Sequence, residues 1–106
     1  MEKHLLFEKK NEMFQLPDRK VVNAKLNERL FCLSRIGEEV FAFERNCPHL
    51  SVPLSQSGVL NTYGDLVCKE HGHSYSLKTG ECKNNPYETL KMYRVSVEKD
   101  RVYVEL

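Results

Sequence analysis

The chain lacks any excess of charge of one sign and any long apolar run, and these absences exclude several classes of function. It carries 16 Lys and Arg residues against 15 Asp and Glu, a net charge of +1, with no basic stripe of the kind that binds nucleic acid. No stretch approaches the roughly 18 apolar residues that span a membrane. The first ten residues do not have the pattern of a signal peptide. We therefore expect a soluble, cytoplasmic monomer that binds neither nucleic acid nor a membrane.

Cysteine is scarce, with four residues in the chain: Cys32, Cys47, Cys68 and Cys82. Four cysteines could form two disulfides, but in a chain that looks cytosolic metal binding is the better interpretation. Cys32 lies in an apolar run and is expected to be a small buried hydrophobic residue. Cys82 follows a turn, and the sequence assigns it no role.

Helical periodicity is also nearly absent, and a period of two replaces it. At 106 residues with 41% hydrophobic content, the chain is long enough for one small domain with a thin core. We expect an all-β fold of short antiparallel strands, with at most one helical turn within residues 84–91. The expected strands are residues 4–8, 19–26, 30–36, 40–43, 65–67 and 74–77, and a final hairpin of 93–98 and 102–106 around Lys99-Asp100.

Two mixed pairs of cysteine and histidine are the strongest signal in the sequence. They are Cys47-Pro48-His49 and Cys68-Lys69-Glu70-His71. Each pair offers one thiolate and one imidazole, which suits a [2Fe–2S] cluster with two histidines on one iron. Two cysteines and two histidines can also hold a tetrahedral zinc ion, although zinc ligands usually come in pairs of one residue type.

At these residues the chain resembles the Rieske iron–sulfur family. The match runs through Cys47-Pro48-His49-Leu50 and Cys68-Lys69-Glu70-His71-Gly72, then Tyr75, Thr79-Gly80 and Pro86. The resemblance implies stacked antiparallel sheets in one domain, residues 1–106, with a small cluster-binding subdomain at about residues 45–75 inserted in a basal β domain.

The resemblance also implies the residues around the cofactor. Cys47 and Cys68 would ligate one iron of a single [2Fe–2S] cluster, and His49 and His71 the other. Further residues are expected to surround the cluster: Leu50, Val52, Gly72, His73, Tyr75 and Pro86. The apolar residues among 50–54, including Leu54, are expected to form a collar around its exposed edge.

Three positions predict a reduction potential in the lower part of the Rieske range, which runs from about −150 to +300 mV. High-potential members join their two ligand loops by a disulfide, and here the corresponding positions are Val52 and Glu70. They also place a serine where this chain has His73. Tyr75, by contrast, occupies the place of a donor to a ligand sulfur.

The expected function is that of a soluble one-electron carrier between a reductase and a terminal enzyme such as an oxygenase. Catalysis by this chain alone is not expected, because a mononuclear iron site needs two further histidines and a carboxylate. After the cluster, only His4 and His73 remain, and they are poorly placed to pair. The alternatives are a small subunit of a nitrite-reductase-like enzyme and a structural zinc-binding module.

Overall fold

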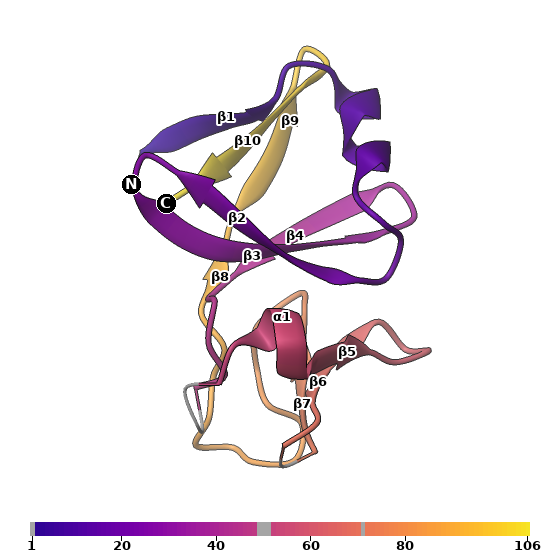
Figure 1. The fold of residues 1–106 in the computed structure, drawn as a ribbon, viewed down its shortest axis with the longest axis vertical. Coiled ribbons are helices and arrows are strands. Elements are labelled where there is room, and N and C mark those ends of the chain that lie inside the picture. Colours follow the sequence, from indigo (N-terminus) through magenta and orange to yellow (C-terminus); the bar gives the residue numbers. More distant parts are fainter. Residues whose placement is uncertain (1, 49–51, 71) are drawn as a thin grey trace.

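The computed structural model describes residues 2–48, 52–70 and 72–106. Within these ranges the chain is built of short strands and two short helices (Figure 1). The elements are β1 (Lys3–Phe7), η1 (Lys10–Gln15, a 3₁₀ helix), β2 (Val21–Leu26), β3 (Arg29–Ile36), β4 (Glu39–Phe43), α1 (Leu54–Ser57), β5 (Gly58–Leu60), β6 (Asp65–Cys68), β7 (His73–Ser76), β8 (Met92–Tyr93), β9 (Val95–Glu98) and β10 (Arg101–Glu105).

The strands form three sheets, in the orders β1-β10-β9, β2-β3-β4-β8 and β5-β6-β7. All pairings within these sheets are antiparallel. The predicted all-β fold of antiparallel sheets is therefore confirmed. No helix in the described ranges is long and apolar enough to cross a membrane.

The middle sheet has an apolar cluster on each of its two faces. Successive side chains of a strand point to opposite faces, so one strand supplies both clusters. Along β3, Phe31 and Leu33 enter one apolar cluster with the first sheet, whereas Cys32 enters a second cluster with the third sheet. Along β4, Ala42 joins the first cluster and Phe43 the second. These strands consequently read as nearly continuous apolar runs in the sequence.

The third sheet and α1 form the lower part of the molecule in Figure 1, away from the two chain termini. The chain enters this part after Phe43 and returns at Met92, and the two residues are paired across β4 and β8. The backbone N–H of Glu44 donates to the carbonyl of Lys91 at 2.9 Å, which extends this pairing by one step. The chain therefore leaves strand β4 and returns to strand β8 through two adjacent segments.

The sequence predicted the positions of the helices wrongly. Residues 84–91 contain a turn at Pro86-Tyr87 instead of a helical turn, stabilised by the side chain of Asn85, which accepts the N–H of Tyr87 at 3.0 Å. The helices are instead η1 and α1. Helix α1 follows Pro53 directly and is four residues long, too short to leave a helical period in the sequence.

Cys32 is completely buried, as predicted for a small apolar residue. Burial raises the pKa of its thiol from 9.0 to about 11, and the nearby Glu44 carboxylate adds to this shift. The folded protein therefore binds this proton more tightly than the unfolded chain does. Its contribution to stability is complete below pH 9 and is lost as the pH rises towards 11.

Replacement of Cys32 by Ser should remove this pH dependence. In the wild type, the Cys32 contribution to the free energy of unfolding should fall steadily as the pH rises from 9 to about 11. In Cys32→Ser the fall over this range should be shallower, since a serine hydroxyl does not titrate there. Urea midpoints of both proteins at several pH values measure the difference, and equal slopes would contradict the assignment.

Candidate metal centre

Cys47 is held at the base of a closed loop. Its backbone N–H donates to the carbonyl of Val52 at 2.9 Å, and the N–H of Leu54 donates to the carbonyl of Arg45 at 2.9 Å. These bonds join the two arms of the loop on either side of its tip. The Cys47 side chain is 1% exposed, so the thiol points into the protein and not into solvent.

Cys68 ends β6 at the start of a second loop. Its backbone pairs with Gly58 of β5 on one side and with His73 of β7 on the other. The N–H of Gly72 donates to the Cys68 carbonyl at 2.8 Å, and Gly72 has φ +69°, the left-handed conformation that favours glycine. No atom of the described residues lies within 4 Å of the place where a Cβ at position 72 would stand, so the positive φ is what this part of the chain requires of the residue.

The two cysteines enter one buried cluster together with Tyr75 of β7. The Tyr75 hydroxyl lies 3.8 Å from the Cys47 sulfur, within reach of a hydrogen bond to sulfur. Burial raises the pKa of Tyr75, and the contact with Cys47 raises it further. The phenol therefore stays protonated, and against a thiolate it is the donor.

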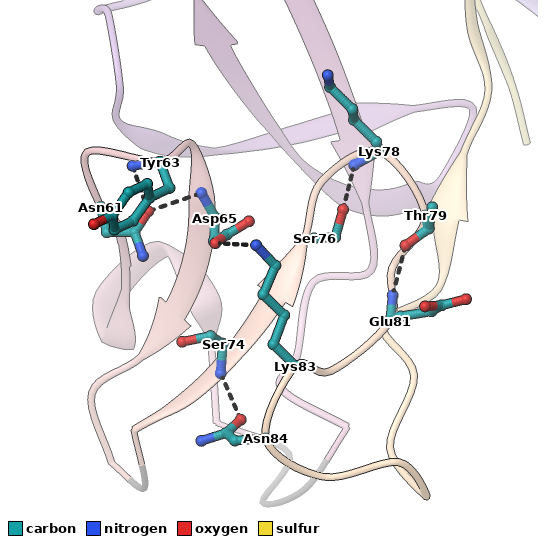
Figure 2. A network of polar contacts seen from close by, with 10 residues as sticks. All are labelled: Asn61, Tyr63, Asp65, Ser74, Ser76, Lys78, Thr79, Glu81, Lys83 and Asn84. Atoms are coloured by element: carbon teal, nitrogen blue, oxygen red, sulfur yellow. Dashed lines mark hydrogen bonds and ion pairs between the residues drawn. The ribbon is translucent and has the colours of Figure 1, made fainter.

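A third segment, residues 82–88, lies against the second loop and is called the covering loop below. Pro86, predicted to cover the cluster, is exposed in the turn of this loop. The loop is attached at its root by Lys83, whose backbone N–H donates to the Ser74 carbonyl at 2.7 Å. The Lys83 ammonium also pairs with the buried Asp65 carboxylate of β6 at 2.7 Å (Figure 2).

Asn84 adds a side-chain connection between the covering loop and the second loop. The N–H of Ser74 donates to its Oδ1 at 3.1 Å, as Figure 2 shows. Its Nδ2 donates to the carbonyl of Gly72 at 3.1 Å. Sequence reasoning missed Asn84 because the run Asn84-Asn85-Pro86 reads as an ordinary turn, and two partners of Asn84 are 10 and 12 residues away.

The remaining predicted residues divide into those inside and those outside the described ranges. His49, Leu50 and His71 lie outside them. His73 is half-buried in β7, and Val52 is half-buried against the same cluster as the cysteines. The expected collar is wrong for Leu54, which is 0% exposed and belongs to the core of this cluster.

Cys82 joins the same buried cluster. Its backbone forms an isolated bridge with Tyr75, and its thiol donates to Oδ1 of Asn84 at 3.2 Å. None of the four cysteines forms a disulfide. Within the described residues no three Cys, His, Asp or Glu side chains gather closely enough to hold a metal ion, and both predicted histidine ligands lie beyond that set.

The described half of the centre fits the donor set of a [2Fe–2S] cluster. Cys47 and Cys68 come from two different loops and are both excluded from solvent. A phenol donor stands beside one of their sulfurs. Buried thiolates with a hydrogen-bond donor are the environment in which iron–sulfur clusters are held and tuned.

Comparison with known proteins agrees with this description. The model of the Rieske [2Fe-2S] domain family matches residues 8–94. No curated protein matched the sequence.

Three solved structures illustrate the similarity. The ferredoxin of carbazole 1,9a-dioxygenase from Nocardioides aromaticivorans IC177 is 18% identical, with a TM-score of 0.74 over 95% of this chain and 93% of that one. A putative NADH-dependent nitrite reductase small subunit from Mycobacterium tuberculosis is 17% identical, with a TM-score of 0.76 over 97% and 93%. A complex of reduced oxygenase and oxidized ferredoxin in carbazole 1,9a-dioxygenase contains a chain that is 22% identical, with a TM-score of 0.72 over 96% and 91%.

Proposed function

The chain belongs to the Rieske [2Fe-2S] domain family, and we propose that it is a one-electron carrier whose cluster is held by Cys47, His49, Cys68 and His71. The two cysteines would bind one iron and the two histidines the other, within a cluster-binding subdomain at about residues 45–75. When bound, such a cluster accepts one electron and releases it again. The protein is a component of an oxidoreductase system and not itself a catalyst.

The observation that best supports this proposal is the burial of Cys47 and Cys68 in one cluster beside the Tyr75 hydroxyl. The fold excludes water from both thiols, and Tyr75 supplies a donor to the Cys47 sulfur. A donor to sulfur stabilises negative charge there, and the reduced state carries one more negative charge than the oxidised state. The polypeptide thus contributes both a dry pocket for the sulfurs and a bias towards electron uptake.

We propose a reductase as the electron donor and a terminal oxygenase as the acceptor. The support is the similarity to a ferredoxin seen in complex with its oxygenase. This role suits a soluble, cytoplasmic monomer that binds neither nucleic acid nor a membrane, and the nearly balanced charge of the chain agrees with it.

A second candidate is the small subunit of a nitrite-reductase-like enzyme, which the similarity to the Mycobacterium tuberculosis protein favours. The two roles differ in what the chain does by itself. A carrier is reduced and reoxidised as a free protein, whereas a small subunit copurifies with a large catalytic chain. Expression with a histidine tag in its native cell, followed by identification of bound chains, separates these roles.

The first test is electron paramagnetic resonance of the purified protein after dithionite reduction, with iron and sulfide analysis of the same sample. We expect a rhombic signal with an average g value below that of the free electron, and about two irons for each chain. A silent sample with one zinc ion for each chain would overturn the electron-transfer proposal and support a structural metal-binding module.

A further inference from the structure

The side chain of Asn84 uses both of its polar groups to connect two loops. Its Oδ1 accepts the N–H of Ser74 at 3.1 Å and the thiol of Cys82 at 3.2 Å. Its Nδ2 donates to the carbonyl of Gly72 at 3.1 Å. No smaller or purely apolar side chain could make both kinds of contact, because one partner is a carbonyl and the others are donors.

The residues that Asn84 contacts lie close in the sequence to a proposed ligand. Gly72 directly follows His71, a proposed ligand, and its carbonyl faces Asn84. Ser74 is two residues further along, in β7, which also carries Tyr75. Gly72, next to the proposed ligand, and Ser74 of β7 are therefore both held to the covering loop by the amide of Asn84.

The neighbouring Asn85 shows what an ordinary turn asparagine does in this loop. Its Oδ1 accepts the N–H of Tyr87, two residues on, at 3.0 Å, which is the local Asx-turn contact expected of such a residue. The partners of Asn84 in the second loop are instead 10 and 12 residues away. The loop has its turn residue in Asn85, so the long-range contacts of Asn84 serve a different purpose.

We propose that Asn84 is a positioning residue for the cluster: it clamps the second ligand loop to the covering loop and so sets the geometry around His71. This inference rests on the proposed function, since it concerns how tightly and at what potential the cluster is held. Among the described residues, Asn84 reaches the second loop through Gly72 and Ser74. The side chain is exposed, so its loss should alter the position of the loop more than the stability of the core.

The test compares variants of Asn84 with the same changes at Asn85, all purified with cluster. Asn84→Ala removes every contact of the clamp. Asn84→Asp keeps the acceptor for Ser74 and Cys82 but sets a carboxylate oxygen against the Gly72 carbonyl. Asn85→Ala and Asn85→Asp make the same changes of size and charge one residue along without touching the clamp.

The readouts are the rate of cluster loss in excess chelator, the reduction potential and the g values of the reduced protein. We expect Asn84→Ala to lose its cluster about five- to tenfold faster than the wild type, a factor typical of losing one or two hydrogen bonds, with shifted g values. Asn84→Asp should lower the potential further than Asn85→Asp does, because both add one charge but only the former disturbs the clamp.

Equal rates and g values in Asn84→Ala and Asn85→Ala would overturn the clamp while leaving the proposed function intact. A wild-type protein without two irons would instead overturn the proposed function. If the alanine variant does not fold, the isosteric Asn84→Asp against Asn85→Asp decides the question by the same readouts.

Discussion

His49→Ala or His71→Cys is expected to abolish the normal cluster signal of the purified protein. Removal of an imidazole leaves an iron without one of its protein ligands. A cysteine at position 71 adds a negative charge and turns a mixed ligand set towards the all-cysteine type, whose potentials lie near −400 mV. We expect the rhombic signal to disappear in both variants. The iron affinity of His49→Ala should fall at least about tenfold, because loss of a residue that only supports a metal ligand already costs about 10- to 100-fold in affinity. Absorption spectra, paramagnetic resonance and iron analysis measure these effects.

The matched control for these variants is Cys82→Ser, with Cys32→Ser as a second one. Both thiols belong to the same buried cluster as Cys47 and Cys68. A serine at position 82 can still donate to Oδ1 of Asn84, as the thiol does at 3.2 Å, so the covering loop keeps its contact. We expect the normal spectrum in both controls. Loss of the cluster in Cys82→Ser alone would show that the proposed ligand set is wrong.

Strands with a clear period of two could be predicted from the sequence. The hairpin of β9 and β10 was predicted around Lys99-Asp100, and both residues have positive φ there, the conformation of a two-residue hairpin turn. Alternation along Val102 and Val104 fixes which face is buried, and both are 0% exposed. The alternation that predicts such a strand lies within the residues of the strand itself, so it can be recognised without knowing the partner strand.

Short elements fixed by tertiary contacts could not be predicted. Strand β5 has three residues, and its pairing with β6 gives it a structure that no periodicity indicates. Leu54 was expected at an exposed collar, but α1 turns it into the core. A four-residue helix after a proline leaves too little pattern to show which way its side chains point.

The candidate site, like the fold, has residues that could be predicted from the sequence and one that could not. The pairs around Cys47 and Cys68 could be recognised because metal ligands need particular residue types at close spacing. Tyr75 could be placed by its position after the second pair, and the structure brings its hydroxyl to 3.8 Å from the Cys47 sulfur. Asn84 could not be found this way, since its role depends on which loop lies opposite and on nothing in the neighbouring sequence.

Among the features that set the potential, the Tyr75 hydroxyl is the one that the structure places directly. The disulfide of high-potential members cannot form at Val52 and Glu70, neither of which is a cysteine. The serine donor of those members is replaced by His73. If Tyr75 supplies the main remaining donor to a ligand sulfur, the potential should lie in the lower part of the range of about −150 to +300 mV and should depend strongly on this one hydroxyl.

Tyr75→Phe is therefore expected to lower the reduction potential by roughly 60 mV. The phenol donates to the Cys47 sulfur, and this bond is stronger in the reduced state because that state carries one more negative charge. A difference of about 1.4 kcal/mol between the two states, within the range that a typical hydrogen bond contributes, corresponds to about 59 mV for one electron. Phe fills the same buried space, so the cluster should be retained.

Tyr63→Phe is the matched control, because it removes a hydroxyl from a residue that is 85% exposed. Potentiometric titration of the three proteins measures the effect, and an equal potential in Tyr75→Phe and the wild type would remove Tyr75 from the features that set it.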